Sequence, residues 1–422
     1  MRRWPLAFLY LAILILIGMT ACSSPSPAPT SQAETETSPT AAALIEPTGT
    51  FILSPPPTQE NFPPSTGRQL LPTLSLEDMP ETPQAVPTFD RSAALPTPTL
   101  PAGMNLHSAG LEIITAENVR QLELVAEIRS DDGINSNVAF SPDDRWLVAG
   151  SSTGNIHVWD AATGEEVAVL EGHTSRVRSI AFSPDGDLLA SGSWDKTVIL
   201  WDTTTWTPIR TLLGHEHYVS QVAFSPDGTL LASGGTPLIV WDVGTGEPLY
   251  SINASGLIPE DLEFSPDGSL LASAHGETDF FLWDALDGSL VHELVGETTT
   301  SFLAFSAEGM LAAASSGFSA GDMNPLGQIL FWDPWLGTPL GATQENAATH
   351  EMIFTVDSSL LITCGWAGND MLFWRTADGM RIWELTGHPR LVYTVALSND
   401  GTLLASGDLD GRILIWALPD GS

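Results

Sequence analysis

The 422-residue sequence predicts an all-β fold, a seven-bladed β-propeller of four-stranded antiparallel sheets, from two repeated markers. A tryptophan returns after 42, 40, 42, 49, 42 and 42 residues, and an apolar marker residue precedes each of these tryptophans. A period of about 40–45 residues is typical of stacked supersecondary units. The tryptophans are Trp159, Trp201, Trp241, Trp283, Trp332, Trp374 and Trp416, and the markers are Phe140, Phe182, Phe224, Phe264, Phe305, Phe354 and Leu397.

The second unit shows how each repeat is expected to form four strands. Apolar residues 177–182 form the first strand, and the Ser-Pro-Asp-Gly sequence at 183–186 provides a turn. Proline presets φ there, and glycine accepts the left-handed conformation. Residues 188–190 form the second strand, and 198–201 are apolar in succession, as in a strand covered on both faces. An outer strand near 208–212 completes a sheet, and radial stacking of such sheets gives a propeller.

The order of the strands predicts how the ring closes. The last tryptophan, Trp416, lies too near the C-terminus for its unit to include an outer strand. Residues 121–126 have outer-strand character and belong to no unit of their own. We therefore expect this N-terminal strand to complete the seventh sheet, which would cover an edge that otherwise invites aggregation.

Several short motifs recur in register with the tryptophans. Aspartate follows the first five of them, Gly-His pairs stand at 172–173, 214–215 and 387–388, and Leu-Ala-Ser-Gly begins at Leu189 and twice more. The units resemble WD repeats of the WD40 type, over about three quarters of the chain. The resemblance implies that partners dock on the face formed by two sets of loops, the outer-to-inner loops and those between the second and third strands.

Two units contain histidine, serine, aspartate and tryptophan at identical spacings. Serine, histidine and aspartate together invite a hydrolase interpretation. In the WD-repeat family these four residue types instead form a buried hydrogen-bonded chain, in which every donor and acceptor is satisfied. We expect this structural role, and no catalytic residue, cofactor or metal site. The two sets are His173, Ser191, Asp195 and Trp201, and His388, Ser406, Asp410 and Trp416.

The other units depart from this pattern, so the first, fourth, fifth and sixth blades are expected to depend mainly on packing. Cys364 stands where the sixth unit would have its serine, and we expect it to be an inert core residue. The third unit has no aspartate beside His215, Ser233 and Trp241; the fourth has Ser255 and Glu277 at the histidine and aspartate places, and the first has Asp131 and Ala149.

The repeat register also maps the expected docking face. Arginine, tyrosine and tryptophan dominate interface hot spots, and several fall at this register. The fifth unit is longer than the others, and its extra residues lie within 315–327 on the same face. Long loops on rigid scaffolds often carry function. The alternative for the aromatic and arginine residues is that they belong to an ordinary propeller rim, and the alternative for the longer loop is that it is a tolerated insertion. The candidate interaction residues are Arg176, Arg178, Trp194, His217, Tyr218, Phe318, Tyr393 and Leu409.

Residues 1–21 are expected to be an export signal of a lipoprotein. Two arginines precede a short apolar stretch, followed by Met-Thr-Ala-Cys at 19–22. This ending resembles the lipobox of bacterial lipoproteins, in which Cys22 would carry a diacylglycerol. The alternative is an uncleaved transmembrane anchor with an incidental cysteine.

Residues 22–105 are expected to form a disordered tether before the propeller at 106–422. More than half of the 31 prolines lie in this segment among serine and threonine, without a persistent apolar period. Such a composition buries too little apolar surface to offset the entropy of ordering. The oxygen-rich residues 131–137 are interpreted as a polar turn, with a calcium site as the alternative.

The charge balance excludes several classes of partner. The chain has 51 acidic and 15 basic residues and a formal charge of -36, which repels nucleic acid. Membrane contact is expected only through lipidated Cys22. We predict a monomeric, non-enzymatic scaffold for unidentified protein partners, lipid-anchored in the cell envelope outside the cytoplasmic membrane of a bacterium. The alternative is an extracytoplasmic enzyme or small-ligand sensor that uses the central channel, which would need convergent carboxylates or metal ligands at the axis.

Overall fold

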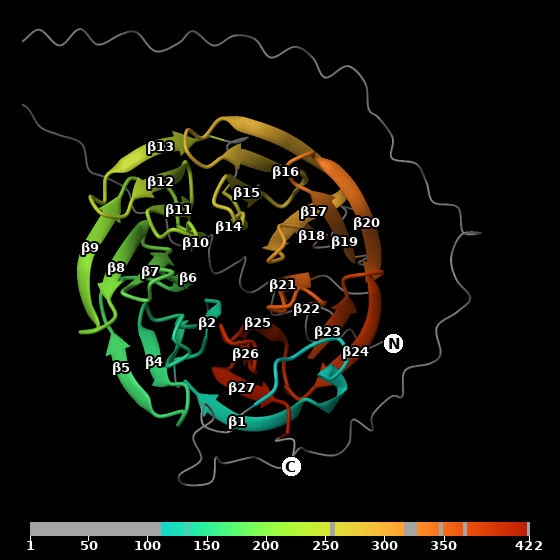
Figure 1. Ribbon diagram of the computed structural model, residues 1–422. Coiled ribbons are helices and arrows are strands. Elements are labelled where there is room, and N and C mark those ends of the chain that lie inside the picture. Colours follow the sequence, from blue (N-terminus) through green and yellow to red (C-terminus); the bar gives the residue numbers. More distant parts are fainter. Residues whose placement is uncertain are drawn as a thin grey trace, which may run out of the picture. The chain divides into compact units, whose positions relative to one another are not determined.

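The computed structural model describes residues 111–419, except 131, 135, 254–257, 316–326, 346–348 and 366–368. The described strands form seven antiparallel blades around a central axis, which confirms the predicted all-β propeller (Figure 1). Cys22, Phe318, Ser255 and Asp131 lie outside the described residues. Among the described residues, the 3-10 turn η3 (Val119–Gln121) precedes the first strand.

Blades 1 to 3 each consist of four consecutive strands from the axis outward. They comprise β2 (Val138–Phe140), β3 (Trp146–Gly150), β4 (Ile156–Asp160) and β5 (Glu166–Leu170); β6 (Val177–Phe182), β7 (Leu188–Ser193), β8 (Thr197–Asp202) and β9 (Thr207–Leu213); and β10 (Gln221–Phe224), β11 (Leu230–Gly234), β12 (Leu238–Asp242) and β13 (Pro248–Ile252).

Blades 4 to 7 follow the same order, with two exceptions described below. They comprise β14 (Asp261–Phe264), β15 (Leu270–Ala274), β16 (Glu277–Asp284) and β17 (Leu290–Phe305); β18 (Leu311–Ser315), β19 (Gly327–Asp333) and β20 (Thr338–Glu345); β21 (Thr349–Phe354), β22 (Leu360–Gly365), β23 (Asp370–Arg375) and β24 (Met380–Thr386); and β25 (Val392–Leu397), β26 (Leu403–Asp408), β27 (Arg412–Ala417) and β1 (Glu123–Arg129).

The first exception is β17, which belongs to two blades. Its first part pairs with β16 as the outer strand of blade 4, and its last part pairs with β18 as the inner strand of blade 5. The two blades therefore share one seven-stranded sheet. Between them the sequence has three consecutive threonines, which favour extended structure, and no Gly-His pair.

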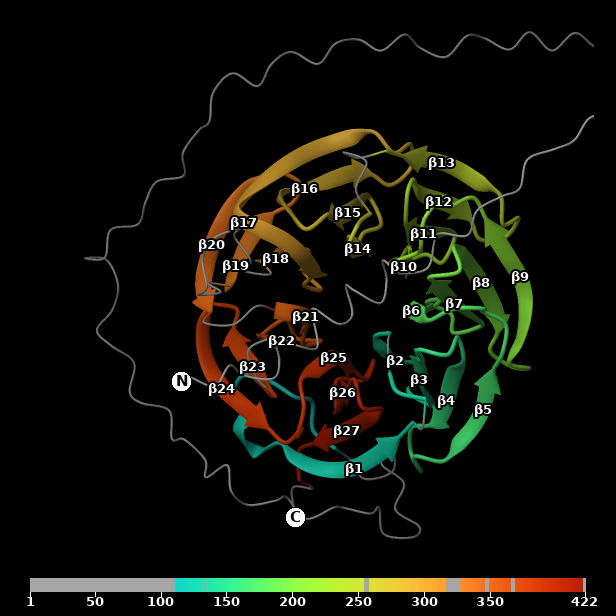
Figure 2. The ribbon, with the colours of Figure 1, turned by 180° about the vertical axis from the view of Figure 1, so that it is seen from behind.

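The second exception is the closure of the ring, which confirms the predicted clasp. The strand β1 pairs antiparallel with β27, from Glu123 opposite Ala417 to Arg129 opposite Arg412. Figures 1 and 2 show β1 on the outer edge of blade 7, where it completes the sheet. The segment before it is also anchored, because the backbone N–H of Ile114 donates to the carbonyl of Gly401 at 2.9 Å.

The turn between the inner strand and the next strand explains the Ser-Pro-Asp-Gly motif. In blade 2 the Ser183 hydroxyl donates to Asp185 at 2.6 Å and accepts the backbone N–H of Leu188 at 2.9 Å. Gly186 adopts a φ of 77°, in the region that glycine enters most readily. The motif therefore fixes the register of the first two strands.

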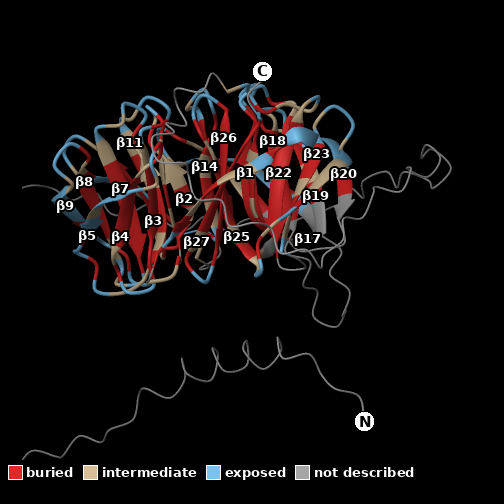
Figure 3. Ribbon diagram, turned by 90° about the horizontal axis from the view of Figure 1, so that it is seen from below, coloured by how far each residue is buried: buried red, intermediate tan, exposed pale blue. Residues whose placement is uncertain are grey.

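The hydrophobic core lies between neighbouring blades. Val148 and Val158 of blade 1, for example, belong to one buried cluster with Ile180, Leu189 and Trp201 of blade 2. Figure 3 shows the buried strands within the ring and exposed turns on its two faces. In the described part of the chain, no helix is long and apolar enough to cross a membrane.

Candidate functional site

Blade 2 contains the hydrogen-bonded chain of its histidine, serine, aspartate and tryptophan. The His173 ring lies 2.9 Å from Asp195 through Nδ1 and 2.7 Å from the Ser191 hydroxyl through Nε2. The Trp201 indole N–H donates to the same hydroxyl at 2.8 Å. Ser191 is fully buried and uses its oxygen both to accept and to donate. The four residues thus join the strands of one blade and present no accessible nucleophile.

In blade 7 the prediction that Asp410 is the partner of His388 is wrong. Asp408, not Asp410, lies 3.1 Å from His388 Nδ1, and Ser406 accepts the Trp416 indole N–H at 2.8 Å. Asp408 is buried at the end of β26, whereas Asp410 lies in the following turn and pairs with Arg390 at 3.2 Å. Burial alone would raise the pKa of Asp408, but hydrogen bonds from His388 and two backbone N–H groups hold it below its usual value.

Blade 3 replaces the missing aspartate with a backbone carbonyl. The His215 ring lies 2.9 Å from the oxygen of Pro237 and 2.7 Å from the Ser233 hydroxyl, which accepts the Trp241 indole N–H. A carbonyl only accepts, so Nδ1 carries the proton. Burial lowers the pKa of His215 to about 4, which keeps the ring neutral at neutral pH.

Blades 4 and 6 each retain part of the side-chain hydrogen-bonded chain, through residues that the sequence analysis missed. In blade 4 the Trp283 indole donates to Ser273, which lies 3.0 Å from His275. In blade 6 the Trp374 indole donates to Thr363 at 3.1 Å, so Thr363 and not Cys364 occupies the serine place. Successive side chains of a strand point to opposite faces, and Cys364 is buried in the core on the other side.

Three of the candidate interaction residues form a stack on the rim of blades 2 and 3. The Arg176 guanidinium lies 4.2 Å from the ring centroid of Trp194, and the Trp194 and Tyr218 rings lie 5.2 Å apart. Trp194 is 44% exposed and Tyr218 is 38% exposed. We call these three residues the rim stack. His217 and Leu409 are also exposed but have no described contact with it.

Arg178 and Tyr393 lie in the central channel instead of on the rim. The backbone bulges in β6 between Val177 and Ser179 and in β25 between Val392 and Thr394. A bulge inserts an unpaired residue and redirects its side chain, here toward the axis. The Arg178 guanidinium lies 5.4 Å from the Tyr393 ring centroid. A third bulge, in β21, brings His350 to 3.9 Å from Tyr393 between ring centroids.

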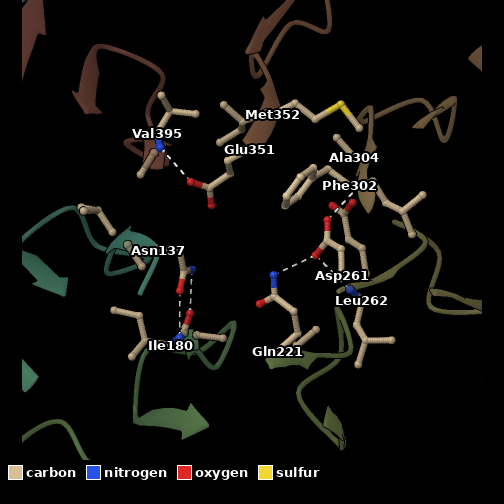
Figure 4. Close-up of a pocket in the computed structure, with 18 of the residues that line it drawn as sticks. Asn137, Ile180, Gln221, Asp261, Leu262, Phe302, Ala304, Glu351, Met352 and Val395 are labelled. Carbon is tan, nitrogen blue, oxygen red and sulfur yellow. Dashed lines mark hydrogen bonds between the residues drawn. The ribbon is translucent and has the colours of Figure 1, made fainter. Parts of the chain in front are cut away.

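The inner strands surround a cavity of about 490 Å³, which contains carboxyl groups that the sequence analysis did not identify (Figure 4). Asp261 accepts the backbone N–H of Leu303 at 2.8 Å and the Gln221 amide at 3.0 Å. Glu351 accepts the backbone N–H of Val395 at 2.8 Å. The channel thus holds fixed carboxyl groups from blades 4 and 6.

Burial determines the protonation of these groups. It raises the pKa of Asp261 and of Glu351 to about 7, and raises that of Glu263 well above its usual value. Burial, with the nearby Arg178, lowers the pKa of His350 to about 3. Among the described residues, no group of three or more His, Cys, Asp or Glu side chains is placed to hold a metal ion.

Polar side chains three positions before the markers also link adjacent blades. Asn137 exchanges two hydrogen bonds with the backbone of Ile180, both at 2.9 Å, and Thr394 accepts the N–H of Val138 at 2.8 Å. Blade 5 alone has an apolar residue, Phe302, at this place. This alignment was the sequence signal for Asp261 and Glu351, since a polar residue stands at this place in six of the seven units and four of these residues line the cavity.

Comparison with known proteins supports the repeat. The family model described as WD domain, G-beta repeat matches residues 123–160, 164–202, 206–237 and 379–417. The intraflagellar transport protein 122 homolog of Danio rerio is 45% identical over 82 residues, which are 19% of this chain and 7% of that protein. The probable serine/threonine-protein kinase PkwA of Thermomonospora curvata is 55% identical over 42 residues, 10% of this chain and 6% of that protein.

A third relative has the same limited overlap. WD repeat-containing protein 82 of Drosophila melanogaster is 33% identical over 62 residues, which are 15% of this chain and 20% of that protein. The matched segments thus span no more than a fifth of the length of these three relatives.

Proposed function

Because the chain carries WD40 repeats folded as a seven-bladed propeller, we propose that it is a non-enzymatic platform that binds other proteins through the rim stack. The relatives named above include a transport protein, a probable kinase and a protein named for its WD repeats, and each matches over a short segment. A shared repeat among proteins of different names favours a binding module over a shared reaction.

The rim stack is the observation that carries this proposal. Tryptophan, tyrosine and arginine are the residue types most enriched in interface hot spots. Their mutual stacking holds Trp194 and Tyr218 in place before binding, so little conformational entropy is lost when a partner covers them. The position of the stack on a turn of β7–β8 and on the loop before β10 leaves it open to a large partner.

Lys196 offers a direct test, since it is the only lysine of the chain and is exposed two residues after Trp194. An amine-reactive crosslinker applied to intact cells is expected to join a partner to Lys196, as read by mass spectrometry. The link should disappear in Lys196→Arg. A partner that binds the protein in a pull-down but is never joined to Lys196 would contradict docking at this face.

Affinity of the identified partner is then expected to fall about tenfold or more in Trp194→Ala, because a hot-spot ring is lost. Trp335→Ala is the matched control: Trp335 has a similar exposed fraction, 43%, but lies in the β19–β20 turn on the opposite face. Equal losses in the two variants would assign binding to neither face.

We also propose that the protein is a bacterial lipoprotein, anchored outside the cytoplasmic membrane through Cys22 with the propeller acting as a monomer. Support comes from the basic start, the short apolar stretch and the residues before Cys22. A single acyl chain binds membranes only marginally, so stable anchoring would need the several chains that lipoproteins carry.

Changing Cys22→Ser is expected to move the protein from the membrane fraction to the soluble fraction and to abolish labelling by a palmitate analogue. Cys364→Ser is the control, since the chain has two cysteines and Cys364 is buried in the propeller. Labelling that persists in Cys22→Ser would reject the anchor. An unmodified protein that is membrane-bound but takes up no label would support an uncleaved transmembrane segment instead.

A further inference from the structure

The central channel contains a cationic group that no other described side chain satisfies. Arg178 has five N–H donors, and within the described residues it makes no hydrogen bond or ion pair; its guanidinium faces the Tyr393 ring, and Glu260 and Glu351 act on its charge only through space. A partly buried guanidinium without acceptors is unfavourable, because the water that it loses is not replaced. The planar fork of arginine matches a carboxylate, which accepts two parallel hydrogen bonds.

The same channel contains acceptors with spare capacity. Glu351 is held by the N–H of Val395, and Asp261 by the N–H of Leu303, so each carboxyl group is fixed in position. An ionised carboxylate has about four acceptor sites, more than these bonds occupy. Figure 4 shows the Glu351 and Asp261 side chains reaching into the cavity from different blades. An ammonium group has three donors and favours the ionised form of such carboxyl groups.

We propose that the central channel binds a small amphoteric ligand of the α-amino acid class, with its carboxylate on Arg178 and its ammonium on Glu351 and Asp261. The cavity volume of about 490 Å³ falls in the usual range of small-molecule sites, about 300–1,000 Å³. Phe302 and Met352 form an apolar part of the cavity wall, against which the side chain of the ligand would pack.

The mixture of charges is what selects this ligand class. A lone anion would pair with Arg178 but would leave the spare acceptor sites of Asp261 and Glu351 unused. A lone cation would meet these carboxyl groups but would be repelled by Arg178. A ligand that carries both charges satisfies both sets, because Arg178, Asp261 and Glu351 line the same cavity.

The first test uses the unmodified full-length protein, screened with each of the twenty amino acids by thermal shift and then by calorimetry. At least one amino acid is expected to raise the melting temperature and to bind with measurable heat. Acetate and methylamine, which carry the two charges separately, should bind at least about tenfold more weakly, because each leaves one set of channel groups unpaired. No binding by any amino acid, or equal binding by acetate or methylamine, would overturn the proposal.

The second test assigns the residues. Arg178→Met and Glu351→Gln are each expected to weaken binding of the identified amino acid about tenfold or more. Arg390→Met is the control, since Arg390 lies outside the channel and pairs with Asp410. Folding of each variant is checked by its melting temperature without ligand. Unchanged affinity in a folded Arg178→Met would reject the site, and retained affinity in Trp194→Ala would show that it operates independently of the rim stack.

Discussion

A chain that begins after Arg129 is expected to lose cooperative folding as a monomer. Removing the clasp takes Ile114, Val119, Leu122 and Ile128 out of the core, where all are buried. Burial of such side chains contributes about 1.5–3 kcal/mol each, so the loss is about 6–12 kcal/mol. This approaches the entire stability of a typical protein, about 5–15 kcal/mol. The deletion also exposes the edge of β27, which has no other partner on that side.

Thermal melting and size-exclusion chromatography measure this effect. The matched control is a chain that begins at residue 106, which lacks the tether but keeps the clasp, and it should melt like the full-length protein. The clasp deletion should melt at a much lower temperature, or elute as oligomers that pair through the bare strand. Equal melting of the two truncations would mean that β1 adds nothing to closure.

A smaller change tests the same contact without altering the chain length. Ile128 points into the cluster between blades 1 and 7, and Ile128→Ala is expected to cost about 2–5 kcal/mol. Glu123→Ala, at an exposed position of the same strand, should cost less than about 1 kcal/mol. The difference separates core packing by β1 from its backbone pairing with β27.

Much of the fold follows from two markers in each repeat. The tryptophan belongs to the third strand and the apolar marker ends the first, so their spacing fixes the intervening hairpin in most blades. The closure of the ring was also predictable, because the seventh unit lacks an outer strand and residues 121–126 have outer-strand character without a unit of their own. The continuous β17 was not predicted. Each unit was expected to have its own inner and outer strand, whereas the outer strand of blade 4 and the inner strand of blade 5 are one extended segment.

The candidate site was harder to predict because it depends on features that do not repeat. Arg178 and Tyr393 were assigned to the rim, and bulges in β6 and β25 turn them into the channel. Spacing along the chain does not reveal a bulge, which changes the side-chain direction without changing the sequence period. The carboxyl groups of Asp261 and Glu351 were missed because the repeat was aligned on its motifs, and these residues lie between the motifs.

The assignment of Asp410 failed for a related reason. Aspartate four residues after serine is correct in blade 2, where Asp195 reaches His173. Blade 7 has aspartate both two and four residues after Ser406, and the spacing copied from blade 2 selects the second. Burial decides between them: Asp408 ends a buried strand, and Asp410 is solvated.

Replacing Asp408 with alanine is therefore expected to lower the free energy of unfolding by about 3–5 kcal/mol, because the buried His388 loses its partner. Asp410→Ala removes an exposed ion pair with Arg390 and should cost less than about 1 kcal/mol. Urea denaturation of the two variants compares them directly. If Asp410→Ala were the more damaging change, the original assignment would be restored and the described geometry of blade 7 would be wrong.

The pH dependence of the same pair supplies an independent check. The pKa of Asp408 is lower in the folded protein than its ordinary value of 3.8, so its stabilising effect is fully present above that pH. As the pH falls below 3.8 the unfolded chain takes up the proton first, and the contribution of the carboxylate declines. The difference in stability between the unmodified protein and Asp408→Asn, which keeps the shape but not the charge, should therefore shrink on acidification. A difference that stays constant from neutral pH to below 3.8 would mean that the charge of Asp408 does not stabilise the fold, and that blade 7 is held by the neutral hydrogen bonds of Ser406 and Trp416 alone.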